Sequence, residues 1–144
     1  MSGAGGAAAT ATTSMVQPLK TNEDVVRARQ MVREQAGALR FGLVDQTKLV
    51  TAASELARNT ITYGQGGEMQ LTVVERAGAR GLRLTFIDQG PGIEDIARAL
   101  TDGYTSGGGM GLGLSGSKRL CDEFEIESTP GAGTRVTIVK WKRA

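Results

Sequence analysis

Apolar residues recur at helical spacing in the first half of the chain and predict two long amphipathic helices. The first follows a capping residue, Thr21 or Asn22, and runs to about Leu39. The second is expected over residues 45–63, where the apolar side chains fall within one arc of about 100°. Each helix therefore has one face that must be buried against another layer.

Alternating apolar and polar residues predict two hairpins. The first joins strands at 69–76 and 82–88, and the second joins strands at 124–129 and 134–141. A short strand is also expected at 15–19, before the first helix. Two further helices are expected, over residues 93–100 and from about 111–113 onward. This grouping indicates an α+β fold: a two-layer sandwich in which helices cover one face of a mixed β-sheet.

The beginning of the chain differs in composition from the rest. Residues 1–14 are nearly all glycine, alanine, serine and threonine, which offer little apolar surface to bury. We therefore expect a disordered tail over 1–14 and a single folded domain over 15–144.

Composition excludes several classes of protein. The 144 residues contain no histidine, so a Ser-His-Asp triad, a zincin helix and a phospho-accepting histidine are excluded. One cysteine, Cys121, excludes an internal disulfide, and its apolar surroundings favour a reduced core thiol over a reactive one. The net charge of +2 gives no case for a nucleic-acid or membrane partner. Without a signal peptide or a long apolar segment, we expect a cytoplasmic protein.

A glycine-rich run at 107–116 is the first candidate for chemistry. Residues 111–116 match G-x-G-x-x-G, but that fingerprint needs a strand directly before it, and 101–110 shows no periodicity. A P-loop is excluded too, because Gly-Ser-Lys stands where Gly-Lys-Ser/Thr is required. Glycines at a helix start still let backbone N–H groups approach a phosphate, with a flexible loop as the alternative.

Polar groups also stand beside two predicted buried faces. Glu55 and Asn59, one turn apart, share one edge of the apolar arc, which suits a pocket wall or an ordinary solvated flank. Asp88 follows a buried strand, and Gly90 and Gly92 keep side chains away from it. A carboxylate there can accept a hydrogen bond from the exocyclic amine of adenine, or can cap a strand-exit turn.

The order of these segments is more specific than any one of them. E-L-A-R-N on a helix, D-Q-G-P-G-I after a hairpin, G-G-G-M-G-L-G-L at a later helix start and G-A-G-T before the last strand resemble the four boxes of the GHKL family. The resemblance spans about residues 15–143 and is closer to the family's bacterial stress-signalling serine/threonine kinases. The segments D-Q-T-K (45–48), K-R-L-C-D-E-F (118–124) and the terminal K-W share in it.

The resemblance implies a role for each candidate residue. Asn59 would be the protein ligand of Mg²⁺, with phosphate oxygens and water as the other ligands. Glu55 would accept the proton of the substrate hydroxyl or orient it. Asp88 would bind the adenine amine of ATP, and Thr134, next to Asp88, would take part in this contact through water.

The same resemblance assigns the glycines. Gly90 and Gly92 would shape the adenine floor, and residues 101–110 would be a short ATP lid. Backbone N–H groups would reach the phosphates from Gly109, Gly111 and Gly113. Lys118 or Arg119 either adds charge there or belongs to a solvated helix face.

The function implied by the resemblance is phosphoryl transfer. Residues 15–144 would be a GHKL ATP-binding kinase domain that phosphorylates Ser/Thr of STAS-domain partner proteins in a bacterial stress-signalling partner switch. The protein would also bind and activate a PPM-type serine phosphatase. The alternative is an ATP-dependent binding switch of the anti-sigma type without kinase activity. Glu55 favours the kinase, because a pure binder needs no proton acceptor, and Asn59 and Asp88 disfavour a catalytically dead adaptor.

Overall fold

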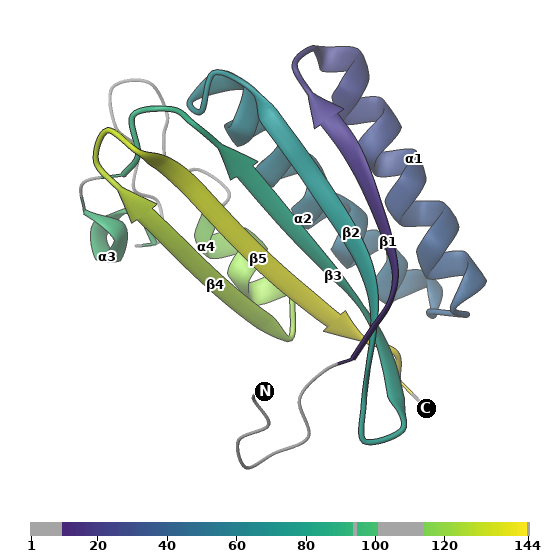
Figure 1. Ribbon diagram of the computed structural model, residues 1–144. Coiled ribbons are helices and arrows are strands. Elements are labelled where there is room, and N and C mark those ends of the chain that lie inside the picture. The colour runs from purple at the N-terminus through teal and green to yellow at the C-terminus, as the bar shows by residue number, and fades with distance from the viewer. Residues whose placement is uncertain (1–9, 94, 101–113, 144) are drawn as a thin grey trace.

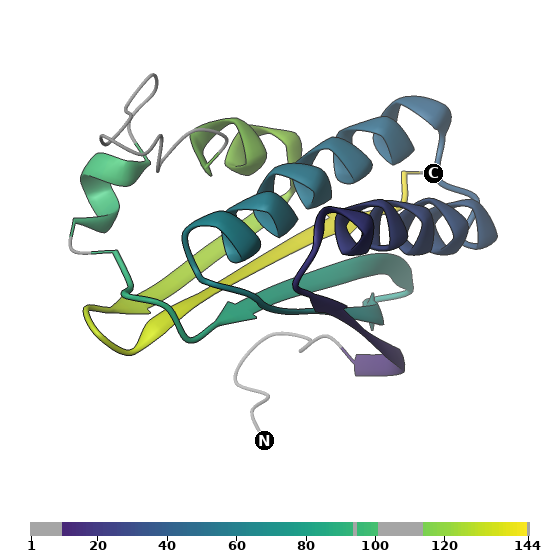
Figure 2. The ribbon, with the colours of Figure 1, turned by 90° about the horizontal axis from the view of Figure 1, so that it is seen from above.

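The computed structural model describes residues 10–93, 95–100 and 114–143, which form a five-stranded sheet with helices on one face (Figures 1 and 2). The two-layer α+β class is therefore confirmed. In chain order the elements are β1 (Thr10–Leu19), α1 (Asn22–Ala38), α2 (Leu43–Thr62), β2 (Gly67–Arg76), β3 (Ala79–Asp88), α3 (Ile96–Ala99), α4 (Leu114–Leu120), β4 (Glu123–Thr129) and β5 (Gly133–Trp141).

The strand order is β1-β2-β3-β5-β4, and each described pairing is antiparallel. The expectation of a mixed sheet is therefore wrong. Strands β3 and β4 do run in the same direction, joined by a segment that includes α3 and α4. The tight turn after β4 then returns β5 between them, so the two parallel strands are never neighbours (Figure 1).

The hydrophobic core lies between the sheet and the helices. Leu49 and Leu56 of α2 and Leu71, Leu84 and Ile138 of the sheet belong to one buried cluster. Burying each such side chain stabilises the fold by about 1.5–3 kcal/mol. The helix start expected at Thr21 or Asn22 is Thr21, whose hydroxyl accepts a hydrogen bond from the N–H of the third helical residue. No helix in the described part of the chain has the length and apolar character needed to cross a membrane.

Several element boundaries differ from expectation. β3 begins at Ala79 rather than residue 82, because the turn before it has only two residues, Ala77 and Gly78. β1 begins at Thr10 rather than residue 15, and its first residues pair with β2 as far as Glu75. Composition underestimates this strand because main-chain hydrogen bonds to a neighbouring strand require no apolar side chain. Helix α3 is one turn instead of the expected 93–100, and Asp95 caps it. Residues 1–9 and the helix start expected at 111–113 lie outside the described residues.

A buried charge network joins the C-terminal end of β5 to the start of α2 and to the end of α4. The Lys140 ammonium, with its side chain 4% exposed, lies 3.6 Å from Asp45 Oδ1 and 4.0 Å from Asp122 Oδ1. It also donates to the Leu120 carbonyl at 3.0 Å. A buried ammonium needs such partners. The network thus brings together the D-Q-T-K, K-R-L-C-D-E-F and K-W segments, which lie far apart in the sequence.

The β2–β3 turn yields a stability prediction. Its central residues Ala77 and Gly78 have φ of 52° and 85°, the backbone of a type I′ turn. Alanine is strained there by about 1–2 kcal/mol, whereas asparagine tolerates this region. Ala77→Asn should raise the free energy of unfolding by about 1 kcal/mol in urea titration. Gly78→Ala, the matched control, should lower it. A more stable alanine variant at residue 78 would contradict this account of the turn.

Candidate functional site

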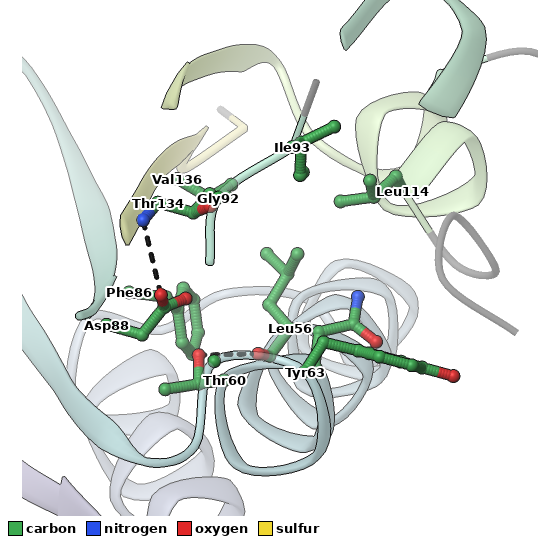
Figure 3. Close-up of a pocket in the computed structure, with 12 residues that line it drawn as sticks. Leu56, Thr60, Tyr63, Phe86, Asp88, Gly92, Ile93, Leu114, Thr134 and Val136 are labelled. Atoms are coloured by element: carbon green, nitrogen blue, oxygen red, sulfur yellow. Dashed lines mark hydrogen bonds between the residues drawn. The ribbon is translucent and has the colours of Figure 1, made fainter. Parts of the chain in front are cut away.

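A pocket lies between α2, the adjoining ends of β3 and β5, and α4 (Figure 3). Four predicted site residues line it: Asn59, Asp88, Gly92 and Thr134. Their segments are far apart in the sequence, so the fold has brought them together. The remaining lining residues are Leu56, Thr60, Tyr63, Gly64, Phe86, Ile93, Leu114 and Val136.

Asp88 is held in a fixed orientation at the end of β3. Its Oδ1 accepts hydrogen bonds from the backbone N–H of Gly90 at 2.9 Å and of Thr134 at 3.2 Å. Among the described residues, no group hydrogen-bonds to Oδ2. Burial raises the pKa of Asp88 above its ordinary value, and the two backbone N–H groups partly offset that rise. The site therefore offers a positioned acceptor to a ligand's N–H group.

Close backbone contacts around Asp88 account for three glycines. A side chain at Gly64 would overlap the Asp88 carboxyl group, and one at Gly90 would overlap the Gly64 backbone. Gly92 has φ of +79° and faces the Thr129 carbonyl, so a side chain there would be both strained and blocked. Gly90 thus donates a backbone hydrogen bond to the carboxylate without lining the pocket, while Gly92 lines the pocket itself.

Asn59 brings an unsatisfied amide to the pocket. Its Nδ2 is buried and has no hydrogen-bond partner in the described structure. A buried polar group without a partner costs about 1–3 kcal/mol, so this position is suited to a polar ligand. The described residues contain no group of three or more potential metal-ligating side chains. Mg²⁺ bound through the side-chain oxygen of Asn59 would therefore take its other ligands from phosphate and water, an arrangement that Mg²⁺ accepts readily.

Glu55 lies one turn before Asn59 but is not among the residues that line the pocket. Its side chain is 41% exposed and accepts a hydrogen bond from Arg58 at 3.1 Å. Such an exposed ion pair contributes little to stability. The carboxylate is thus on the solvent side of α2, where a second protein can reach it.

The other predicted positions divide into two groups. Gly109, Gly111, Gly113 and the expected lid at 101–110 lie outside the described residues. Lys118 and Arg119 are exposed on α4 and do not line the pocket. Burial raises the pKa of the Cys121 thiol to about 12, so the thiol is protonated at neutral pH and unreactive, as its apolar surroundings predicted.

Sequence reasoning missed the apolar walls of the pocket. Leu56, Phe86 and Val136 belong to regular helix and strand patterns, and nothing local separates a wall from a core position. Gly64 was also missed. Its only sequence signal is its place directly after a helix, a common position for glycine.

Comparison with known proteins places these features in context. Residues 44–144 match the family described as histidine kinase-, DNA gyrase B- and HSP90-like ATPase. The chain is 46% identical over 125 residues to serine/threonine-protein kinase RsbT of Bacillus subtilis (strain 168), covering 87% of this chain and 94% of that protein. It is 33% identical over 119 residues to the anti-sigma F factor of Thermoanaerobacter sp. (strain X514), covering 79% and 82%.

Solved structures share the fold at lower identity. The RsbU and RsbW domains of Rv1364c from Mycobacterium tuberculosis align with a TM-score of 0.62 at 19% identity, over 92% of this chain and 34% of that one. The mycobacterial sensor histidine kinase MprB aligns with a TM-score of 0.52 at 20% identity, over 90% and 99%. Both confirm the two-layer architecture.

Asp88→Asn tests the carboxylate. The amide oxygen can keep both backbone hydrogen bonds, but the amide nitrogen replaces the free acceptor with a donor. ATP affinity measured by calorimetry should fall about ten- to a hundredfold, the equivalent of ~1–3 kcal/mol. Because burial raises the pKa of Asp88, ionisation of its carboxyl group lowers the free energy of unfolding as pH rises. The asparagine side chain stays neutral, so the variant should not have a lower melting temperature at neutral pH. Unchanged ATP affinity would remove Asp88 from the binding site.

Proposed function

The chain belongs to the histidine kinase-, DNA gyrase B- and HSP90-like ATPase family, and on this premise we propose that it is a serine/threonine protein kinase that uses ATP and Mg²⁺. The observation that carries the proposal is the pairing of two open polar groups in one pocket. The Oδ2 atom of Asp88 is free to accept, and the buried Nδ2 of Asn59, a donor, has no partner among the described residues. The RsbT kinase, at 46% identity, supports the same activity.

The adenine ring of ATP would lie at the Asp88 end of the pocket. Its exocyclic amine would donate to Asp88, and the apolar side chains of Leu56, Phe86 and Val136 would contact its faces. Desolvation of a flat aromatic ring against such walls favours binding. The phosphates would then extend toward Asn59 and α4, and the glycines at 109, 111 and 113 would supply backbone N–H groups to them.

Asn59 would hold Mg²⁺ against the phosphates, where the ion supplies charge neutralisation during phosphoryl transfer. The protein's own contribution is mainly positioning, since phosphoryl transfer demands little covalent chemistry from an enzyme. Glu55, exposed one turn away, would accept the proton of the incoming hydroxyl or orient that hydroxyl. Its exposure suits an acceptor residue presented by another protein.

The partners we propose are STAS-domain proteins as phosphate acceptors and a PPM-type serine phosphatase as a second binding partner. The proposal draws on the similarity to RsbT and to anti-sigma factors, which are relatives of partner-switching type. A second function is favoured by the 33% identity to an anti-sigma F factor: ATP-dependent binding of a partner without transfer. The presence of Glu55 supports the kinase over this alternative, because a protein that only binds its partner needs no proton acceptor.

Asn59→Ala tests the metal ligand. The substitution removes the proposed Mg²⁺ ligand and also the buried unpaired amide, so the domain should remain folded while Mg²⁺-dependent ATP binding is lost. Calorimetry with ATP, at fixed ATP and varied Mg²⁺, measures the effect. Thr51→Ala, on the exposed face of the same helix, is the control and should bind as the wild type does. A variant at residue 59 with a normal Mg²⁺ dependence would refute this ligand.

Glu55→Gln tests the catalytic role. The variant keeps the size of the side chain, so ATP affinity and partner binding should survive. Transfer of radiolabelled phosphate to a STAS-domain protein should fall at least about a hundredfold, the usual effect of removing a general base. The control is Glu75→Gln, which changes another exposed, ion-paired glutamate, on β2 and outside the pocket, and should leave transfer unchanged.

Two outcomes distinguish the hypotheses. Equal transfer by wild type and Glu55→Gln would refute the role of Glu55 while leaving the kinase intact. A wild-type protein that binds ATP and its STAS-domain partner together, yet leaves no phosphate on that partner, would support the binding switch and overturn the kinase.

A further inference from the structure

Ser128, near the end of β4, hydrogen-bonds to the segment at Ile93 and to the start of β5, and it does not line the pocket. Its Oγ accepts a hydrogen bond from the Ile93 N–H at 2.7 Å, donates to the Gly133 carbonyl at 3.1 Å and lies 2.8 Å from Thr134 Oγ1. Ile93 and Thr134 both line the pocket. The serine precedes the G-A-G-T segment, and none of the sequence motifs includes it.

The hydrogen-bonding capacity of a hydroxyl determines which way the Thr134 proton points. Serine has one O–H to donate and two lone pairs that accept. All three contacts are satisfied together when Ser128 donates to Gly133, accepts from Ile93 and accepts from the Thr134 hydroxyl. The Thr134 proton is then committed to Ser128, and only the lone pairs of its oxygen remain for a ligand.

This places a second acceptor beside the Asp88 carboxylate. The Thr134 backbone N–H is already bound to Asp88 Oδ1, so that side of the pocket offers Asp88 Oδ2 and Thr134 Oγ1 as acceptors. An exocyclic amine on a purine can donate to such an edge, directly or through water. A carbonyl at the same place would face acceptors alone and remain unpaired, which costs affinity.

We propose that Ser128 is a positioning residue that determines nucleotide specificity: by holding the Thr134 proton away from the pocket, it makes the site select a purine with an amine over one with a carbonyl. The inference rests on the proposed ATP binding and adds to it the residue that orients the acceptor. It also assigns Ser128 the role of anchoring Ile93, a wall of the same pocket.

The test compares ATP with inosine triphosphate, in which a carbonyl replaces the amine, by calorimetry on the full chain. Ser128→Ala should weaken ATP binding about tenfold, because it leaves the Ile93 N–H unpaired and releases the Thr134 hydroxyl. The released hydroxyl can rotate and donate to the carbonyl of inosine, so binding of inosine triphosphate should fall less. The ratio of the two affinities should therefore decrease.

Matched variants separate positioning from a general structural effect. Thr129→Ala removes an exposed hydroxyl from the neighbouring position of the strand and should leave the ratio unchanged. Thr134→Val should lower the ratio by itself, and adding Ser128→Ala to it should change the ratio no further. Equal weakening of both nucleotides by Ser128→Ala, or an unchanged ratio in Thr134→Val, would overturn the inference. A wild-type protein that binds neither nucleotide would instead refute the proposed ATP site.

Discussion

The pocket depends on the hydrogen bond between the Thr134 N–H and the Asp88 carboxylate. Asp88 and Thr134 are register partners on adjacent strands, so the pairing of β3 with β5 delivers both to the same end of the sheet. The same carboxylate accepts from the Gly90 N–H, which ties the following loop to it. One side chain thus sets the relative position of two strands and a loop, and its second oxygen stays open toward the pocket (Figure 3).

That arrangement requires the backbone to come unusually close on every side of Asp88. Gly64 leaves room for the carboxyl group, and Gly133 leaves room for the Asp88 carbonyl. A side chain at Gly64 would displace the Asp88 carboxyl group, and one at Gly133 would push the adjoining ends of β3 and β5 apart. At the opposite end of the sheet, the buried Lys140 network joins β5 to the N-terminal end of α2 and to the turn after α4. Both helices that border the pocket are therefore anchored to the strand that bears Thr134.

The division of exposure across the site fits a kinase that acts on another protein. The pocket is lined by apolar side chains around the Asp88 carboxylate, which suits the proposed recognition of the adenine amine. The proposed proton acceptor Glu55 is 41% exposed on the outer side of the same helix. Glu55 and the pocket residue Asn59 therefore lie on the same edge of α2, one turn apart, with Glu55 nearer to solvent.

The two long helices, the two hairpins and four residues of the pocket could be predicted from the amino-acid sequence; the four residues are Asn59, Asp88, Gly92 and Thr134. Helical and strand periodicity, glycine placement and motif order are local signals, so no long-range contact was needed to detect them. Three features became visible only in the folded chain: β5 separates β3 from β4, Phe86 is a pocket wall, and Ser128 lies within hydrogen-bonding distance of Thr134. Each of these depends on which distant segments pack together, and an apolar or hydroxyl side chain carries no local mark of its distant neighbour.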